Sequence, residues 1–337
     1  MARDEIVAYF EGYVERFQLP VRFGMRVTSV ERKEGGFLVR TAENSYEAAN
    51  VVMATGFFQQ PRIPAFSANV SAGIRQFHSS HYRNPEALPP GAVLVVGSGQ
   101  SGCQIAEELY QSGRGVYLCV SSAGRVPRRY RGRDIGYWLD AIGFMDRTVD
   151  QLPSPQAKFA PNAHLSGAGG GHTINLHRFA REGVVLLGRA QGAQGSALAL
   201  APDLKENLAK ADQFEAELLQ QIDELIEKRG LDVPRETIPE MRDGYDSPLL
   251  RELDLRSAGI SAVIWATGYT FDYSLVKLPV FDEDGYPLQA RGVTEVPGLY
   301  FNGLHFMHNI KSGLLYGVGD DAAHVASHIM GSEPSEG

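Results

Sequence analysis

The sequence predicts an α/β fold in which one domain is inserted into another, and two observations lead to this prediction. First, residues 92–110 (AVLVVGSGQSGCQIAEELY) combine a short apolar strand, a glycine-rich turn and a helical pattern. Second, two apolar strands, at 50–56 (NVVMATG) and 262–269 (AVIWATGY), end in the same small tripeptide on either side of that stretch. Small residues at a strand end allow close approach of a cofactor or a crossing chain. We therefore expect the chain to cross between host and insert near these tripeptides.

Composition narrows the class of protein. A chain of 337 residues with 43% apolar and 21% charged residues is long enough for two globular domains. The net charge of -8 argues against nucleic acid as a partner. Cys103 and Cys119 form no C-x-x-C pair, which disfavours a dithiol reductase of the thioredoxin-reductase kind. The sequence shows no signal peptide and no apolar run long enough to span a bilayer, so we expect a cytoplasmic protein. No metal site is predicted.

The glycine turn has the G-x-G-x-x-G spacing of a dinucleotide-binding fingerprint, between a strand and a helix. The first glycine permits the tight turn, the second lets the backbone approach a pyrophosphate, and the third allows the helix to pack on the strand. The helix N-terminus offers free N–H groups to the phosphates. The predicted pyrophosphate-binding residues are Gly97, Ser98, Gly99, Gln100, Ser101 and Gly102.

The strand at 116–120 (VYLCV) decides which nucleotide is bound. An NAD site usually ends this strand with an acid that binds the ribose 2′-hydroxyl, but here Ser121 and Ser122 follow. Five arginines then occur within nine residues, at 125–133. Arginine can hold a 2′-phosphate bidentately, so we predict NADPH rather than NADH. The first candidates for phosphate contact are Ser121, Ser122, Arg125 and Arg128, followed by Arg129; the alternative is a solvated basic loop.

The remaining elements follow from apolar periodicity and turn residues. The longest helical signal covers 203–229 and ends at Gly230, and the sequence leaves open whether this helix forms a contact in a homo-oligomer. The other predicted helices lie at 3–17, 135–142, within 172–182 and within 313–329, and the other predicted strands lie at 22–32, 37–41, 184–188 and 297–301.

The order of these motifs resembles the flavin-containing monooxygenases and the related bacterial FAD- and NADPH-dependent oxidoreductases. The matching segments are VVMATG, HSSHY, VVGSGQSG, WATGY and PGLYFNG…SGLLYGVGDDAAHVA. The resemblance implies a fold with two dinucleotide-binding domains, in which an NADPH Rossmann domain is inserted into an FAD domain. The implied domains are a partial FAD domain (1–62), the inserted NADPH domain (63–256), the C-terminal part of the FAD domain (257–331) and a tail (332–337).

The resemblance also implies residues for the flavin side. Further cofactor contacts are expected at the two tripeptides and at a helix N-terminus over the flavin: Ala54, Thr55, Gly56, Ala266, Thr267, Gly268, Ser312, Gly313 and Leu314. The candidates for a catalytic role are His308, Lys311 and His78. His78, Ser79 and Tyr82 match the end of the family signature, but Ala72 and Ile74 replace its F-x-G portion, and His78 could equally be an ordinary linker histidine.

One departure from the family pattern concerns FAD. No glycine turn between a strand and a helix precedes Asn50, so we expect an N-terminally incomplete FAD domain and weak or absent FAD binding by residues 1–337 alone. The leading function is a monooxygenase-type reaction, in which hydride passes from NADPH to FAD and the reduced flavin reacts with oxygen and a small organic substrate. The alternatives are an NADPH-dependent flavin oxidase or reductase, and a catalytically incomplete NADPH-binding fragment of a longer flavoprotein.

Overall fold

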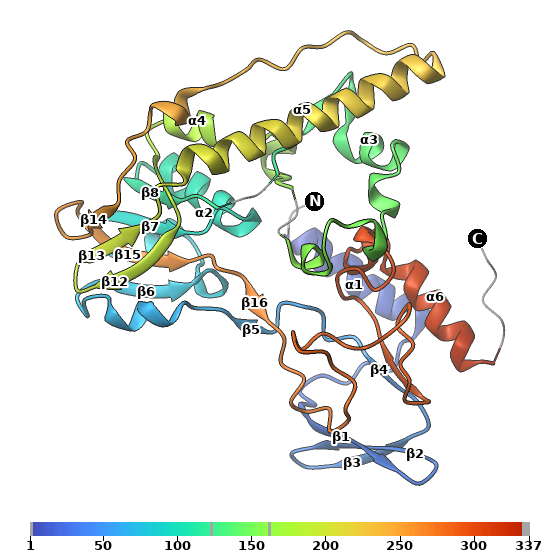
Figure 1. Ribbon diagram of the computed structural model, residues 1–337. Helices are drawn as coiled ribbons and strands as arrows, with labels where there is room; N and C mark the ends of the chain where they lie inside the picture. The colour runs from blue at the N-terminus through green and yellow to red at the C-terminus, as the bar shows by residue number, and fades with distance from the viewer. Residues whose placement is uncertain (1–2, 122–123, 161–162, 332–337) are drawn as a thin grey trace. The chain divides into compact units, whose positions relative to one another are not determined.

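The structure, a computed structural model, describes residues 3–121, 124–160 and 163–331. It divides into two compact units, which we describe separately. The host unit comprises Met1–Phe57 and Phe271–Gly337, and the inserted unit comprises Phe58–Thr270 (Figure 1). The chain therefore crosses between the units after Phe57 and after Thr270, each within two residues of a small tripeptide, and not at 62 and 256.

The inserted unit is built on a five-stranded parallel sheet with the strand order β11-β8-β7-β15-β6. β15 pairs with β7 on one side and β6 on the other, which is why residues 257–270 belong to the inserted unit rather than to the C-terminal part of the host. The strands of this sheet are β6 (Arg75–His78), β7 (Ala92–Val96), β8 (Val116–Cys119), β11 (Val185–Leu187) and β15 (Ile260–Trp265).

Alternate residues of β7 pack on opposite faces of this sheet. Val93 and Val95 face the helices α2 (Gln100–Gln111) and α4 (Leu176–Arg181) within one buried apolar cluster. Leu94 and Val96 lie in a second cluster with the antiparallel sheet β12-β13-β14. That sheet consists of β12 (Ala190–Gln194), β13 (Ala197–Leu200) and β14 (Glu252–Asp254). The inserted unit is thus a three-layer structure of helices, parallel sheet and antiparallel sheet, as Figure 1 shows.

The longest helix is α5 (Leu204–Arg229), and it begins one residue after the predicted start and ends where predicted. Its apolar face packs with α3 (Ile135–Ala141) and with Val126 and Tyr130 of the arginine loop, residues 124–134. Among the described helices, none is both long and apolar enough to cross a membrane. The inserted unit also contains the short strands β5 (Gln60–Pro61), β9 (Arg129–Tyr130), β10 (Arg133–Asp134) and β16 (Tyr269–Thr270).

The host unit contains a three-stranded antiparallel sheet, β1-β2-β3, and a parallel pair of strands, β4 and β17. Val30 and Phe37 form the buried centre of the antiparallel sheet. Helix α1 has the predicted bounds, but several of its aromatic side chains are exposed, among them Tyr9 and Phe17. The elements of the host unit are α1 (Arg3–Phe17), β1 (Val27–Lys33), β2 (Gly36–Thr41), β3 (Ser45–Ala48), β4 (Val51–Met53), β17 (Leu299–Phe301) and α6 (Val318–Ile329).

Candidate functional site

The glycine turn between β7 and α2 is the centre of the candidate site. Gly97 has φ +106°, a conformation that L-residues avoid, and a Cβ there would collide with the Ala266 carbonyl. A Cβ on Gly102 would collide with the Gly97 carbonyl, so this glycine allows the helix to approach the turn. A Cβ on Gly99 would meet no atom within 4 Å. The turn is therefore tight on its inner side and open beside Gly99.

The first turn of α2 leaves backbone N–H groups without partners. Gly99 is the N-cap residue, and no side chain caps the helix there. The first α-helical hydrogen bond is donated by the Cys103 N–H to the Gly99 carbonyl. The N–H groups of Gly99, Gln100 and Ser101 thus have no acceptor among the described residues, an arrangement that is suited to binding an anion.

Ser121, at the end of β8, lies beside this turn. Its N–H donates to the Ser98 hydroxyl (2.9 Å), and that hydroxyl donates to the Ser121 carbonyl (3.1 Å). This pair of hydrogen bonds joins the ends of β7 and β8 at the edge of the sheet where parallel α/β folds bind nucleotides. Ser122, the neighbouring candidate, lies outside the described residues.

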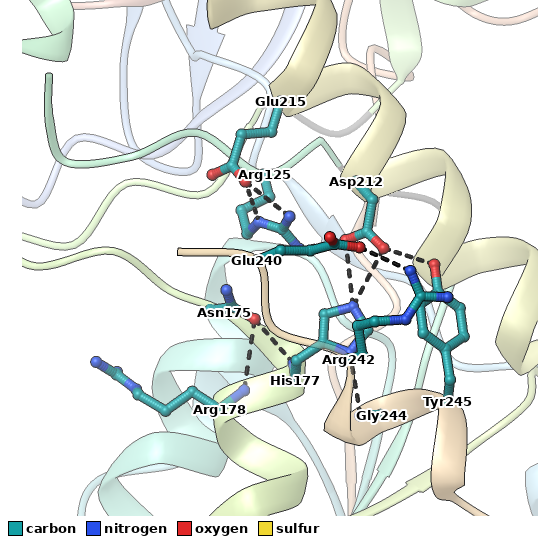
Figure 2. A network of polar contacts seen from close by, with 10 residues as sticks. All are labelled: Arg125, Asn175, His177, Arg178, Asp212, Glu215, Glu240, Arg242, Gly244 and Tyr245. Carbon is teal, nitrogen blue, oxygen red and sulfur yellow. Dashed lines mark hydrogen bonds and ion pairs between the residues drawn. The ribbon is translucent and has the colours of Figure 1, made fainter. Parts of the chain in front are cut away.

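The contacts of Arg125 contradict the prediction that this residue binds the 2′-phosphate. Its guanidinium is buried and donates to Glu215 twice (3.0 and 2.7 Å) and to Asp212 (2.7 Å), both on α5 (Figure 2). Burial opposes its charge, but these carboxylates outweigh that effect and raise the pKa of Arg125. The guanidinium is thus committed to an internal ion-pair network and is not available to a nucleotide.

Asp212 is the centre of this network, and Figure 2 shows three elements converging on it. Besides Arg125, it accepts hydrogen bonds from the Tyr245 hydroxyl (2.5 Å) and from Nε2 of His177 (3.2 Å). His177 Nδ1 accepts from the Gly244 N–H (3.0 Å), which fixes the neutral Nε2–H tautomer. Burial favours the neutral form of Asp212, yet the bonds from Tyr245 and Arg125 lower its pKa. The network joins α4, α5 and the arginine loop.

The other arginines of the loop differ in how far their guanidinium groups are free to bind a phosphate. Arg128 is half-buried, and one arm of its guanidinium pairs with Asp134 (2.7 Å). Arg131 pairs with Asp223, and Arg133 stacks on the Tyr137 ring at 4.2 Å. Arg129 is exposed on β9 and forms no ion pair with a described residue. Arg129 is consequently the most available cation for a phosphate, with Arg128 next to it.

The contacts of His78, one of the three catalytic candidates, also differ from the prediction. The side chain is 1% exposed, and its Nε2 donates to the Gly268 carbonyl (2.9 Å) while Nδ1 accepts from the Ser80 N–H (3.2 Å). The Gly268 carbonyl also accepts from the Arg62 N–H (3.0 Å), and the Thr267 hydroxyl donates to the Arg62 carbonyl. Nε2 of His78 thus contacts the segment that leads out of the inserted unit, and Nδ1 is used in the turn that follows β6. Because both ring nitrogens are occupied and the ring is buried, a catalytic role is not supported.

In the host unit, Ser312, Gly313 and Leu314 do not begin a long helix, which corrects the prediction of a helix N-terminus there. They follow the start of a short 3₁₀ turn (Ile310–Gly313), and α6 begins only at Val318. The Leu314 N–H donates to the Lys311 carbonyl (2.9 Å). The buried Ser312 hydroxyl accepts from the backbone N–H of His308 (3.0 Å). These residues shape the loop rather than present free N–H groups at 314.

The histidines and lysine of this loop are partly buried. The His305 ring lies against Phe57, with centroids 3.6 Å apart, and burial lowers the pKa of His305 to about 4. Lys311 Nζ is 3.9 Å from Asp320 and lies over the Tyr316 ring. His308 and Lys311 both belong to this loop, and the Lys311 ammonium is directed toward Asp320 and Tyr316.

Among the described residues of the host unit, two buried side-chain oxygens have no hydrogen-bond partner: Asn302 Oδ1 and Asp321 Oδ1. His324 Nδ1, on α6 like Asp321, is also buried without a hydrogen-bond partner among the described residues. Buried polar atoms are normally satisfied by protein or ligand, so these acceptors fit a ligand that carries hydroxyl groups. The first tripeptide, Ala54-Thr55-Gly56, follows β4, which pairs with β17 immediately before Asn302.

Residues of the segment 163–173, which was not predicted to belong to the site, contact the glycine turn. The Gln100 carboxamide donates to the Leu165 carbonyl (2.6 Å) and accepts from the Leu165 N–H (2.8 Å). The buried His164 contacts the Ser98 carbonyl through Nε2 (2.6 Å). Nothing in the sequence signals these contacts, because the partners are more than sixty residues apart in a segment with loop-like composition.

Five histidines of the described structure have a lowered pKa, and this predicts acid sensitivity. Burial is the main cause of the lowered pKa at His78, His164, His177, His305 and His324. In the unfolded chain a histidine titrates near pH 6.5, so below that pH the unfolded state binds more protons and unfolding becomes easier. We expect the urea midpoint to fall steadily as the pH is lowered from about 6.5 to about 4. A midpoint that stays constant over this range would contradict the assignment of neutral histidines.

Comparison with known proteins agrees with this geometry. The family described as pyridine nucleotide-disulphide oxidoreductase matches residues 1–143. An uncharacterized CzcO-like oxidoreductase of Geobacillus kaustophilus is 32% identical over 330 residues, which cover 97% of this chain and 78% of the relative. Human flavin-containing monooxygenase 5 is 25% identical over 82% of this chain and 48% of its own length. The structure of a flavin-containing monooxygenase from Stenotrophomonas maltophilia aligns with a TM-score of 0.62 at 17% identity, covering 98% of this chain and 77% of that one.

Proposed function

Because the chain belongs to the CzcO-like oxidoreductases, flavin-monooxygenase-like relatives of the pyridine nucleotide-disulphide oxidoreductases, we propose that it is an NADPH-dependent flavoprotein of monooxygenase type. The observation that carries the proposal is the open glycine turn, which is hydrogen-bonded to a β8 end without an acid and is followed in the chain by a loop that carries the exposed Arg129. Its substrates would be NADPH, oxygen and a small organic molecule. FAD, when bound, would accept hydride from NADPH and react with oxygen.

The inserted unit would bind the NADPH. The N–H groups of Gly99, Gln100 and Ser101 would donate to the pyrophosphate, since they have no other acceptor among the described residues. Arg129 would hold the 2′-phosphate, with Arg128 contributing the part of its guanidinium that Asp134 does not occupy. The absence of an acid at the end of β8 avoids repulsion of that phosphate.

The residues of the host unit fit a flavin in one respect. Asn302 and Asp321 have buried oxygens without partners, and the ribityl hydroxyls of a flavin could donate to them. Neutral His305 beside Phe57 would contribute an apolar, uncharged surface in the same unit. These residues would bind and orient the cofactor and exclude water from it.

Two alternatives remain open. A flavin oxidase or reductase would use the same NADPH site and release peroxide or reduced flavin without oxygenating a substrate. An NADPH-binding module without flavin would use only the inserted unit. Oxygen uptake coupled to product formation distinguishes the monooxygenase from the oxidase, and retained flavin distinguishes both from the module.

Cofactor preference tests the NADPH assignment. Replacing Arg129 with alanine is expected to lower the preference for NADPH over NADH by about tenfold, because a charge-assisted hydrogen bond to phosphate contributes about 1.5 kcal/mol or more. The double variant Arg128→Ala/Arg129→Ala should lower it further. The measurement is the ratio of dissociation constants for NADP⁺ and NAD⁺ by calorimetry.

Arg242→Ala provides the matched control, because Arg242 is an exposed arginine of the same unit that pairs with Glu240. It should leave the ratio unchanged. An unchanged ratio in the Arg128/Arg129 double variant would refute the phosphate assignment.

The flavin half of the proposal is tested by absorption spectroscopy. The purified chain is mixed with FAD, freed of excess, and treated with NADPH without oxygen. A retained flavin band that bleaches supports the flavoprotein reaction. NADPH binding without retained flavin would favour the NADPH-binding module instead.

A further inference from the structure

His164 is a buried histidine at the glycine turn that neither the motif nor the proposed chemistry uses. It comes from the segment 163–173, its side chain is 3% exposed, and its Nε2 lies 2.6 Å from the Ser98 carbonyl oxygen. Because a carbonyl oxygen only accepts, Nε2 must carry the hydrogen. Ser98 is the residue between the first two glycines of the turn, so this hydrogen bond acts directly on the phosphate-binding backbone.

The hydrogen bond to the Ser98 carbonyl also fixes the direction of the Gly99 N–H, because both groups belong to the same peptide plane. The structure contains no cis peptide bond among the described residues, and in a trans peptide the C=O and the following N–H point in opposite directions. His164 and, more weakly, the Cys103 thiol (3.3 Å) hold the carbonyl on the buried side. The Gly99 N–H therefore points away from His164, and no described residue accepts from it.

We propose that His164 is a positioning residue for dinucleotide binding: by holding the Ser98 carbonyl it aims the Gly99 N–H at the pyrophosphate. This inference rests on the proposed NADPH site, and it adds a residue that acts through the turn rather than on the nucleotide itself. Without this donor, the Ser98 carbonyl would be buried without its main partner, and the peptide plane would be free to rotate toward solvent.

His164 is itself fixed from both sides. Its backbone N–H donates to the Gly124 carbonyl (3.0 Å), and it forms a parallel β-bridge with Arg125. The next residue, Leu165, is held by both ends of the Gln100 carboxamide. Since Arg125 is anchored to Asp212 and Glu215, a continuous set of contacts runs from α5 through Arg125 and His164 to the glycine turn.

The proposal makes a prediction that separates it from the 2′-phosphate contact. Replacing His164 with phenylalanine keeps an aromatic ring but removes the donor. The dissociation constants of NADP⁺ and NAD⁺ for the whole chain are expected to rise together by about tenfold, with their ratio unchanged, because both nucleotides share the pyrophosphate. His164→Gln, whose amide nitrogen can reach the position of Nε2, should stay within about threefold of the unsubstituted chain.

His164→Asn and His177→Asn complete the set. Asparagine at 164 is polar but too short to reach the Ser98 carbonyl, so His164→Asn should raise both dissociation constants by the same factor as His164→Phe. His164→Asn also provides the test if the phenylalanine variant does not fold. His177 is equally buried but lies in the Asp212 network, so His177→Asn should lower the melting temperature and leave both dissociation constants unchanged.

The outcomes separate two kinds of failure. If the unsubstituted chain binds neither NADP⁺ nor NAD⁺, the proposed function is wrong. If it binds them and His164→Asn binds equally well, or if folded His164→Gln binds as weakly as His164→Asn, then the positioning role of His164 is wrong while the nucleotide site stands.

Discussion

Replacing Arg125 with alanine is expected to lower the free energy of unfolding by about 4 kcal/mol, the typical effect of removing one partner from a buried ion pair. The substitution would leave Glu215 buried without its donor and would remove one of the donors to Asp212. One oxygen of Glu215, Oε1, already has no hydrogen-bond partner among the described residues. Chemical denaturation monitored by circular dichroism measures the loss.

A double replacement tests whether the loss comes from the unpaired carboxylate. Arg125→Met/Glu215→Leu removes both charges and fills the space with apolar atoms, so it should be clearly more stable than Arg125→Met alone. The ratio of NADP⁺ to NAD⁺ affinity should be unchanged in every folded variant, because the Arg125 guanidinium already donates to Glu215 and Asp212. If the ratio falls while stability is retained, Arg125 contacts the phosphate after all.

Replacing Gly102 with alanine is expected to destabilise the inserted unit by about 2–3 kcal/mol, even though alanine is the better helix former by about 1 kcal/mol. The added Cβ would collide with the Gly97 carbonyl and approach the Ala266 Cβ to 3.2 Å, so either α2 or the turn must move. Dinucleotide binding should be lost with it. Unfolding and calorimetric titration on the same preparation give both quantities.

Gly99→Ala is the informative contrast to Gly102→Ala. Gly99 has φ -71°, which alanine adopts freely, and its Cβ would meet no protein atom within 4 Å. Stability should change by less than about 1 kcal/mol, the scale of an N-cap substitution. The methyl group would nevertheless enter the open space in which we propose that the pyrophosphate binds, so affinity should fall. A Gly99→Ala protein with full affinity would show that the phosphates lie elsewhere.

The local parts of the fold follow from the sequence. The strand, glycine turn and helix from Ala92 to Gln111 have the order and the spacing that the motif predicts. Helix α1 and helix α5 follow from apolar periodicity over fifteen residues or more. The small sheet β12-β13-β14 was not predicted, because AQGAQ and ALAL contain no β-branched or aromatic residues that would indicate strands.

The candidate site was predictable only where its residues are contiguous. Arg125 occurs in a basic loop, and nothing local shows that Asp212 and Glu215, some ninety residues later, bury it. The partner of His78, the Gly268 carbonyl, is 190 residues away. The sequence therefore could not distinguish a buried histidine that hydrogen-bonds a distant segment from an exposed histidine in a linker. At Ser312-Leu314 the sequence shows helical character but not that the α-helix begins four residues later, at Val318.

The hydrogen bonds between β5 and β16 hold the two ends of the inserted unit close together. Pro61 pairs with Tyr269 and Gln60 with Thr270, so the first and last residues of the unit are neighbours in space. Adjacent strands lie about 5 Å apart. A two- or three-residue linker could therefore join them, and new termini could be opened at an exposed loop without disturbing the five-stranded sheet. We expect residues 58–270 to be portable: expressible by themselves, circularly permutable and transferable into another host.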